Sequence, residues 1–466
     1  MDAKRPNKQL TLPFIEPTVG DTHTQSGQGA ESSITPSDRE SPAVPVVTMM
    51  GAICSSSNLA EAIRRVIANK GAAGVDGVTV HDLLPYWRQH GPRIVDQLLN
   101  GTYKPSPVKR VKIPKPDGGV RDLGIPTVAD RVIQQAILQV LQPEWDPTFS
   151  NTSYGFRPGR SAHQAISQAK AFIAKGHDWV VDIDLEKFFD QVNHDRLMRR
   201  LHERIPDKRV IKVIRAFLNA GIMENGLVSQ TEQGTPQGGP LSPFLSNVVL
   251  DELDKELEKR GHAFVRYADD CNIYVRSQSA GERVMKSVSD FISRKLKLKV
   301  NQTKSAVDKP GNRKFLGFTI GGKHASAFVS AKALKRFKDR IRDLTRRGIP
   351  ALKLIGVLNT YLRGWAGYFG HADDHWTLGN LDGWIRRRLR ALSWRSWRTP
   401  RNRFRQLVRR GIAPVEAIRM IRYKKAPWAA SKTIAISMAL PDDLWHRRLK
   451  LVSLLTLWHS MRAQPR

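Results

Sequence analysis

The sequence predicts an α+β fold, in which a mostly antiparallel βαββαβ sheet domain precedes an all-helical region and a basic C-terminal segment. From about residue 160 to 320, helical patterns alternate with short runs rich in β-branched residues. Beyond Ala331 only helical periodicity remains. The chain of 466 residues is long enough for two or three domains, each with its own core.

The N-terminal part begins with a stretch for which we predict no packed structure. Residues 1–50 are rich in Ser, Thr, Pro, Gly and Gln, and they have too few large apolar side chains to form a core. A helical pattern starts near Asn58 and ends at Gly71. Residues 111–126 predict a β-hairpin with Asp117-Gly118-Gly119 at its turn, and an apolar helix follows.

Four β-rich runs and three helical patterns make up the predicted sheet domain, with two helices covering one face of the sheet. The runs are residues 178–186, 263–275, 297–300 and 314–320. The helical patterns are residues 161–175, 194–201 and 279–296. In the all-helical region, apolar periodicity predicts helices around residues 334–344, 354–365 and 381–394.

The charge balance predicts a polyanionic partner. Lys and Arg number 76 against 43 Asp and Glu, a net charge of +33. Residues 383–410 alone hold eleven arginines, three tryptophans and no acid, a composition that suits backbone contacts and base stacking. Two distant cysteines, Cys54 and Cys271, exclude a disulfide framework and a cysteine-rich zinc site. Without a signal peptide or an apolar run long enough for a membrane span, we expect a cytosolic enzyme.

The residues with the clearest chemistry are two acidic blocks. Asp269 and Asp270 interrupt a run that otherwise predicts a buried hairpin, and a tight turn would expose them at the edge of the sheet. The alternative is an ordinary Asp-Asp turn. In the second block, a strand ends in Asp182 and Asp184, with Asp190 close behind. Two-metal nucleotidyl transfer needs carboxylates from separate strands, whereas a structural reading makes these acids helix caps.

From residue 58 to its end, the sequence resembles the reverse transcriptases encoded by group II introns. Residues 184–190 (DLEKFFD) resemble the first catalytic block of that family, and YADD at 267–270 resembles the second. The resemblance implies a right-hand polymerase with Asp184, Asp269 and Asp270 as catalytic residues and ligands of two Mg²⁺ ions, for which Mn²⁺ can substitute. Asp182 stays open as the alternative to Asp184.

Other segments match the family's blocks in order, and they imply further contacts. The residues implied to bind the nucleotide are Lys115, Arg121, Phe189, Gln237 and Lys304. Phe189 would exclude the ribose 2′-hydroxyl, although core packing is the alternative. The family more often has Pro where this chain has Asp122. The implied primer grip is Phe315, Leu316 and Gly317.

The resemblance also implies RNA contacts. The candidates are Arg157, Arg160, Arg363, Trp365, Tyr368, Arg386 and Arg387. Core packing is the alternative for Trp365, and a solvated surface position is the alternative for Arg157 and Arg160. The implied division of the chain is a disordered tail (1–50), an N-terminal extension (51–105), fingers and palm (106–328), a thumb and maturase domain (329–396) and a basic DNA-binding segment (397–466).

The implied partners are group II intron RNA, a DNA target and primer, and deoxynucleoside triphosphates, with no membrane and an open oligomeric state. The implied location is the bacterial cytoplasm and nucleoid. Nothing in the sequence matches the family's His-Asn-His endonuclease, so we expect a member that takes its primer from elsewhere. The alternatives are a reverse transcriptase of a retron, defence or diversity-generating element, and a splicing cofactor with an inactive polymerase site. An RNA-dependent RNA polymerase is a more remote alternative.

Overall fold

The computed structural model describes residues 48–463, except 115–118, 225–226, 230–233, 235–237, 323, 347–350 and 424–425. Nearly all of the predicted tail at 1–50 therefore lies outside the described residues. The chain forms two compact units that alternate along the sequence. The first unit consists of Met1–Gly159, Leu185–Glu256 and Ser289–Asn301, and the second of Arg160–Asp184, Leu257–Val288 and Gln302–Arg466.

The first unit is mainly helical and contains one small sheet. Its helices are α1 (Met49–Cys54), α2 (Ser56–Ala68), α3 (Leu83–Leu99), α4 (Val128–Trp145), α6 (Phe188–Gln191), α7 (His194–His202), α8 (Lys208–Leu218) and most of α9 (Ser242–Lys259). Its strands are β1 (Val108–Pro114), β2 (Val120–Ile125), β4 (Ile222–Glu224) and β5 (Leu227–Ser229), in the order β2-β1-β4-β5. The predicted hairpin is confirmed, because β1 and β2 pair antiparallel. Its predicted turn lies outside the described residues except for Gly119.

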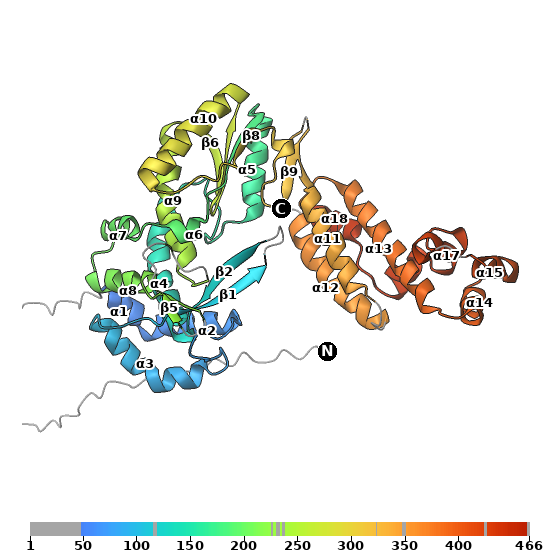
Figure 1. The fold of residues 1–466 in the computed structure, drawn as a ribbon, viewed down its shortest axis with the longest axis horizontal. Coiled ribbons are helices and arrows are strands. Elements are labelled where there is room, and N and C mark those ends of the chain that lie inside the picture. Colours follow the sequence, from blue (N-terminus) through green and yellow to red (C-terminus); the bar gives the residue numbers. More distant parts are fainter. Residues whose placement is uncertain are drawn as a thin grey trace, which may run out of the picture. The chain divides into compact units, whose positions relative to one another are not determined.

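The second unit contains a four-stranded sheet, of which three strands fall in the predicted runs and the fourth, at 306–308, does not (Figure 1). Its strands are β3 (Trp179–Ile183), β6 (Ala263–Tyr267), β7 (Asp270–Val275) and β8 (Ala306–Asp308), in the order β6-β7-β3-β8. Every neighbouring pair is antiparallel. The hairpin predicted at 263–275 is confirmed as β6 and β7. The strand predicted at 297–300 is wrong, because only Val300 forms an isolated bridge, to Leu185.

The side chains of the sheet alternate between its two faces. On one face, Val181 packs against α10 (Gln278–Phe291), where Gly281 lets the helix approach the side chains of β3, β7 and β8. On the other face, Tyr274 contacts Phe172 of α5 (Ala162–Ala174), and Asp182 shares this face with it. The sheet therefore buries an apolar face against α10 and turns its acidic strand ends away from that helix.

The rest of the second unit is a hairpin followed by helices. Strands β9 (Phe318–Gly321) and β10 (Ser326–Val329) pair antiparallel, so the run predicted at 314–320 becomes a strand only from Phe318. The helices are α11 (Ala331–Leu344), α12 (Ala351–Phe369), α13 (His375–Ser396), α14 (Pro400–Val408), α15 (Pro414–Ile421), α16 (Pro427–Ala430), α17 (Ile434–Ala439) and α18 (Leu454–Ala463). Within the described part of the chain, no helix is long and apolar enough to cross a membrane.

Candidate active site

Two acidic segments meet at one end of the β3–β7 pair. The last pair in the register joins Ile183 to Cys271, so the next residues on the two strands are Asp184 and Asp270. Opposite residues on antiparallel strands have Cβ atoms about 5 Å apart. Asp269 comes directly before Asp270, in the turn that connects β6 to β7. The structure thus brings together the carboxylates of all three residues that we expected to carry catalysis.

Asp182 and Asp184 have different surroundings, although they are two residues apart at the end of β3. The Asp182 carboxylate accepts two hydrogen bonds from the guanidinium of Arg313, at 3.0 and 2.7 Å. Burial raises the pKa of Asp182, and Arg313 partly offsets that rise. Among the described residues, the Asp184 carboxylate accepts no such hydrogen bonds, and the Nζ of Lys304 lies 3.7 Å from it. Because Asp182 is already neutralised by an arginine, Asp184 is the better placed of the two to bind a cation.

The acidic cluster makes Asp270 easier to protonate. Burial, and then repulsion from Asp269, Asp182 and Asp184, raise the pKa of Asp270 to about 7, while Lys314 opposes the shift. Because Asp270 is exposed, water and salt weaken the effect of burial, and repulsion among the close carboxylates contributes the rest of the shift. The cluster therefore has an excess of negative charge that a cation would relieve.

A buried arginine supports the turn that carries Asp269 and Asp270. Ala268 has a left-handed backbone, with φ of +58°, which costs a non-glycine residue about 1 kcal/mol. The side chain of Arg266 is 0% exposed, and its Nη1 donates to the Ala268 carbonyl at 2.9 Å. Sequence reasoning missed Arg266, because a charged residue in a strand gives no sign that it will be fully buried.

Residues 304 and 305 contact Asp184 from the loop before β8. The Asp184 amide donates to the Ser305 hydroxyl at 3.0 Å, which fixes the backbone where β3 ends. The exposed Lys304 was expected to bind nucleotide, and it lies beside the Asp184 carboxylate. Lys304 was a candidate site residue from the sequence, whereas nothing in the sequence indicated that Ser305 would contact Asp184.

The donors in this cluster suit Mg²⁺, which prefers hard oxygen ligands. Among the described residues, no three His, Cys, Asp or Glu side chains are already arranged around one metal position. Magnesium commonly binds through one or two carboxylates, water and substrate phosphates, and so does not need a complete protein cage. The residues present therefore fit Mg²⁺ sites that substrate would complete.

The segment predicted as a primer grip forms a tight turn. Phe315 and Phe318 exchange two backbone hydrogen bonds of 2.9 Å, and Leu316 and Gly317 between them both have positive φ. The Tyr368 hydroxyl at the end of α12 donates to the Leu316 carbonyl at 2.9 Å. A Cβ on Gly317 would lie 3.2 Å from the Phe369 ring. The turn is therefore held against α12.

Comparison with known proteins assigns the family. Residues 113–320 match the model of the reverse transcriptase (RNA-dependent DNA polymerase) family, and residues 334–411 match the group II intron maturase-specific domain. Protein YkfC of Escherichia coli (strain K12) is 33% identical over 57% of this chain and 80% of its own length. The group II intron-encoded protein LtrA of Lactococcus lactis subsp. cremoris is 38% identical over 42% of this chain and 32% of its own.

This chain belongs to the group II intron-encoded reverse transcriptases. As an enzyme it is an RNA-directed DNA polymerase. The alignment spans about a third of LtrA. Among solved structures, telomerase from Candida albicans aligns over 82% of this chain and 69% of its own, with 12% identity and a TM-score of 0.46.

The residues that we expected to bind nucleotide in this reverse transcriptase are only partly described. Lys115 and Gln237 lie outside the described residues. The backbone of Arg121 lies in β2 opposite Ile113. Its neighbour Asp122, the departure from the family pattern, forms an ion pair of 2.6 Å with Arg110 of β1.

Phe189 lies in the short helix α6 and is half-buried. Its ring makes an edge contact with the buried Phe188, 5.3 Å between centroids. Gly234 packs against the same turn, and a Cβ there would lie 2.8 Å from the Phe189 carbonyl. The Gly234 amide also donates to the Val192 carbonyl at 2.9 Å. Gly234, with φ of +95°, thus holds the segment that carries Phe189.

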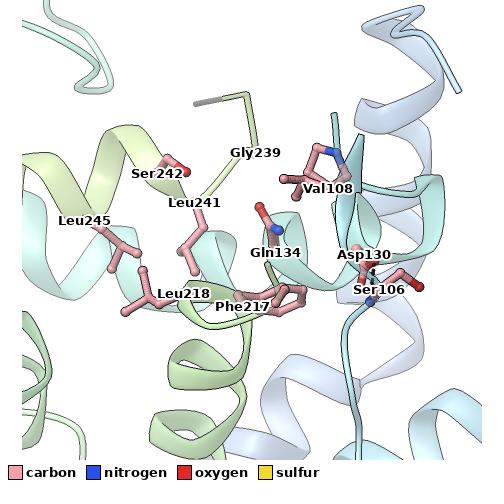
Figure 2. Close-up of a pocket in the computed structure, with 12 residues that line it drawn as sticks. Ser106, Val108, Asp130, Gln134, Phe217, Leu218, Gly239, Leu241, Ser242 and Leu245 are labelled. Carbon is pink, nitrogen blue, oxygen red and sulfur yellow. Dashed lines mark hydrogen bonds between the residues drawn. The ribbon is translucent and has the colours of Figure 1, made fainter. Parts of the chain in front are cut away.

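The two glycines of the PQGGP motif allow a close approach to neighbouring backbone and side chains. A Cβ on Gly238 would lie 2.5 Å from the Gly124 carbonyl of β2, and one on Gly239 would overlap the Gln134 side chain of α4. Figure 2 shows Gly239 and Gln134 beside a small cavity that Asp130 also lines. This cavity, of about 20 Å³, has room for about one water molecule. The motif is therefore packed tightly onto β2 and α4.

The structure places the candidate RNA contacts of the helical region differently from one another. Arg363 is exposed on α12, whereas Trp365 is 8% exposed and packs against Phe337 and Phe369, at 4.5 and 4.8 Å between ring centroids. Arg386 pairs with Asp442 at 2.9 Å, and the Arg387 guanidinium stacks 3.8 Å from the centre of the Trp428 ring. Of these, only Arg363 presents a largely exposed side chain.

The expectation of a nucleic-acid contact at Arg157 is wrong. Its side chain is 3% exposed, and its guanidinium donates to the Asp146 carboxylate and to the carbonyls of Asp146, Ser150 and Ser153. These contacts occupy all its N–H groups. Arg160, the other candidate of this block, is half-buried.

Proposed function

We propose that this reverse transcriptase copies intron RNA into DNA by two-metal nucleotidyl transfer, and that it binds the same RNA to assist splicing and mobility. The observation that carries the proposal is the meeting of Asp184 with Asp269 and Asp270 at the end of the β3–β7 pair. The match of residues 334–411 to the maturase-specific domain supports the RNA-binding role.

Asp184, Asp269 and Asp270 would hold the ions. When bound, Mg²⁺ supplies the positive charge that activates the primer 3′-hydroxyl and neutralises the departing pyrophosphate. Arg266 keeps the turn in the geometry that presents two of these carboxylates. Lys304, which lies beside Asp184, would donate a proton to pyrophosphate.

We assign the remaining parts of the chain by the same proposal. Residues 106–328 correspond to fingers and palm, 329–396 to thumb and maturase domain, and 397–466 to a DNA-binding segment. The turn at Phe315, Leu316 and Gly317 would hold the primer end.

The test is to incubate the purified protein with its flanking intron RNA, a primer, deoxynucleotides and Mg²⁺. We expect RNA-templated DNA and faster splicing of the same RNA. Faster splicing without any DNA product would favour the alternative of a splicing cofactor. DNA synthesis without an effect on splicing would point to another mobile or defence element.

Replacing Phe189 by Ala should raise ribonucleotide incorporation at least about tenfold, because the ring would no longer exclude the 2′-hydroxyl. The measurement is single-nucleotide extension with matched ribo- and deoxynucleotides. Phe328→Ala is the control, since Phe328 is an exposed ring on β10. If Phe189→Ala and the control discriminate equally well against ribonucleotides, Phe189 has a packing role alone.

The apparent affinity for Mg²⁺ should fall as the pH drops below about 7. Below that pH, Asp270 holds a proton in the metal-free protein, and the cation must displace it, at a cost of up to about tenfold in affinity per pH unit. The measurement is a Mg²⁺ titration by calorimetry in buffers of different ionisation enthalpy, which reports proton release. Asp270→Asn should remove the released proton. An affinity that stays flat between about pH 6 and pH 8 would contradict the shared proton.

The raised pKa of Asp270 also predicts how the stability of the metal-free protein depends on pH. The folded pKa of about 7 exceeds the ordinary value of 3.8, so the folded protein holds more protons than the unfolded chain between the two. Metal-free stability should therefore fall as pH rises through this window, and Mg²⁺ should raise the melting temperature more at about pH 8 than at about pH 6.

A further inference from the structure

A basic pocket in the helical part of the second unit has no role in the chemistry above. It has a volume of about 730 Å³, within the range of about 300–1,000 Å³ that is typical of small-ligand sites. Elements from the end of α11 to the segment before α18 surround it. Four arginines line it, and no Asp or Glu does: Arg346, Arg395, Arg398 and Arg403.

Three of the four arginines are exposed and available for an anion, whereas Arg403 donates to the Trp397 carbonyl at 3.0 Å and stacks 4.5 Å from the centre of the Trp394 ring. Arg395 and Arg398 are exposed, and neither makes a side-chain hydrogen bond or ion pair within the described part of the chain. Arg346 pairs only with Asp343 of its own helix end, with 76% of its side chain exposed. A guanidinium offers a planar fork of donors that suits phosphate oxygens.

The pocket also has apolar lining. Leu354 and Leu389 contribute aliphatic surface, and Trp445 contributes an aromatic one. Trp445 is 5% exposed, so only a small part of it is accessible from the pocket.

A pocket lined by both apolar side chains and arginines matches the two parts of a nucleotide. An unpaired base has flat apolar faces and polar edges, and its phosphate carries the negative charge. A base inside a duplex cannot enter such a pocket, because stacking and pairing hide its faces. Neither the catalytic carboxylates nor the primer-grip turn lines this pocket.

We propose that this pocket binds one unpaired nucleotide of a single-stranded RNA, with the base against the apolar side chains and the phosphate among the arginines. The proposal rests on the RNA-binding role proposed above and gives it a location. It predicts that the helical region recognises RNA by capturing an extruded base as well as by its overall charge.

The test compares two double variants of the full-length protein that change the net charge equally. The pocket variant is Arg395→Glu with Arg398→Glu. The control variant is Arg401→Glu with Arg409→Glu, two exposed arginines of the same region that do not line the pocket. Fluorescence anisotropy at about 0.15 M salt measures affinity for a single-stranded oligouridylate, for a DNA strand of matched sequence and for duplex RNA.

We expect the pocket variant to lose about tenfold more affinity for single-stranded RNA than the control, with no such excess for duplex RNA. Equal losses in the two variants, or the same excess with duplex RNA, would overturn the proposal. An excess confined to DNA would overturn the assignment to RNA. Competition by uridine monophosphate as strong as that by the oligomer would instead identify a free-nucleotide site, which also overturns it.

Trp445→Phe provides a second readout, because it reduces the aromatic surface that lines the pocket. We expect a loss of about threefold in single-stranded RNA affinity, measured at a temperature at which the variant stays folded. Crosslinking of a 4-thiouridine oligomer should label peptides of the pocket, and labelling elsewhere alone would contradict the assignment. Primer extension by the wild-type protein distinguishes failure of this proposal from failure of the proposed function. If the wild type makes DNA but the pocket and control variants lose the same RNA affinity, only the pocket proposal is refuted. If the pocket variant shows the selective loss but the wild type makes no DNA, only the polymerase proposal is refuted.

Discussion

Replacing Asp269 and Asp270 together by Asn should lower Mg²⁺-dependent DNA synthesis at least about 10³-fold, because the lost charge removes several kcal/mol of transition-state stabilisation. The affinity for intron RNA should stay within about threefold, since neither residue carries the positive charge that binds phosphate. Primer extension and anisotropy on the same preparation measure the two effects.

The control for this variant is Asp290→Asn, which removes one exposed carboxylate on α10 where the double variant removes two. Its DNA synthesis should equal that of the wild type. The double variant should also melt no lower than the wild type without metal, because it relieves the repulsion that raises the pKa of Asp270. Retained DNA synthesis in a folded double variant would refute the assignment of the active site.

Arg157→Met should destabilise the first unit by about 3–5 kcal/mol. In the wild type one guanidinium donates to a largely buried carboxylate and three carbonyls, and the variant removes this donor from all four acceptors. Urea denaturation measures the change. Arg199→Met is the control, since the Arg199 side chain is 84% exposed and makes only a long contact of 4.0 Å with Glu203 in the described part of the chain. The control should change stability by less than about 0.5 kcal/mol.

RNA affinity separates the two interpretations of Arg157. If its role is structural, Arg157→Met at a temperature where it stays folded should bind RNA as well as Arg199→Met does. A normal denaturation curve together with a selective loss of RNA affinity would restore the original expectation of a nucleic-acid contact.

The parts of the fold that follow local rules could be predicted from the sequence. Runs of apolar and β-branched residues predicted the hairpin of β6 and β7, and helical spacing predicted α2, α5 and α10. The acidic blocks could be recognised in the sequence because their carboxylates interrupt apolar strands. The strand expected at 297–300 was wrong because a short apolar run does not reveal whether a neighbour is available to pair with it.

The residues that support the site could not be predicted. Some act through contacts with residues far away in the sequence, and others are buried although their residue type is usually exposed. Arginines in a basic protein are expected at the surface, yet Arg157 and Arg266 are buried and bind carbonyls. The sequence leaves Asp182 open as the alternative to Asp184. The ion pair with Arg313, 131 residues away from Asp182, distinguishes the surroundings of the two residues.

The pairing of β3 with β8 has a consequence for how the protein is made. About 120 residues separate Asp184 from the strand that completes its sheet, so a ribosome adding about 5–20 residues per second needs some 6–25 s to supply it. During that interval β3 has no β8 edge to pair with, and Ser305 is not yet there to hold Asp184. Translation must therefore run well past the sheet's first strand before the nascent chain can act on any template.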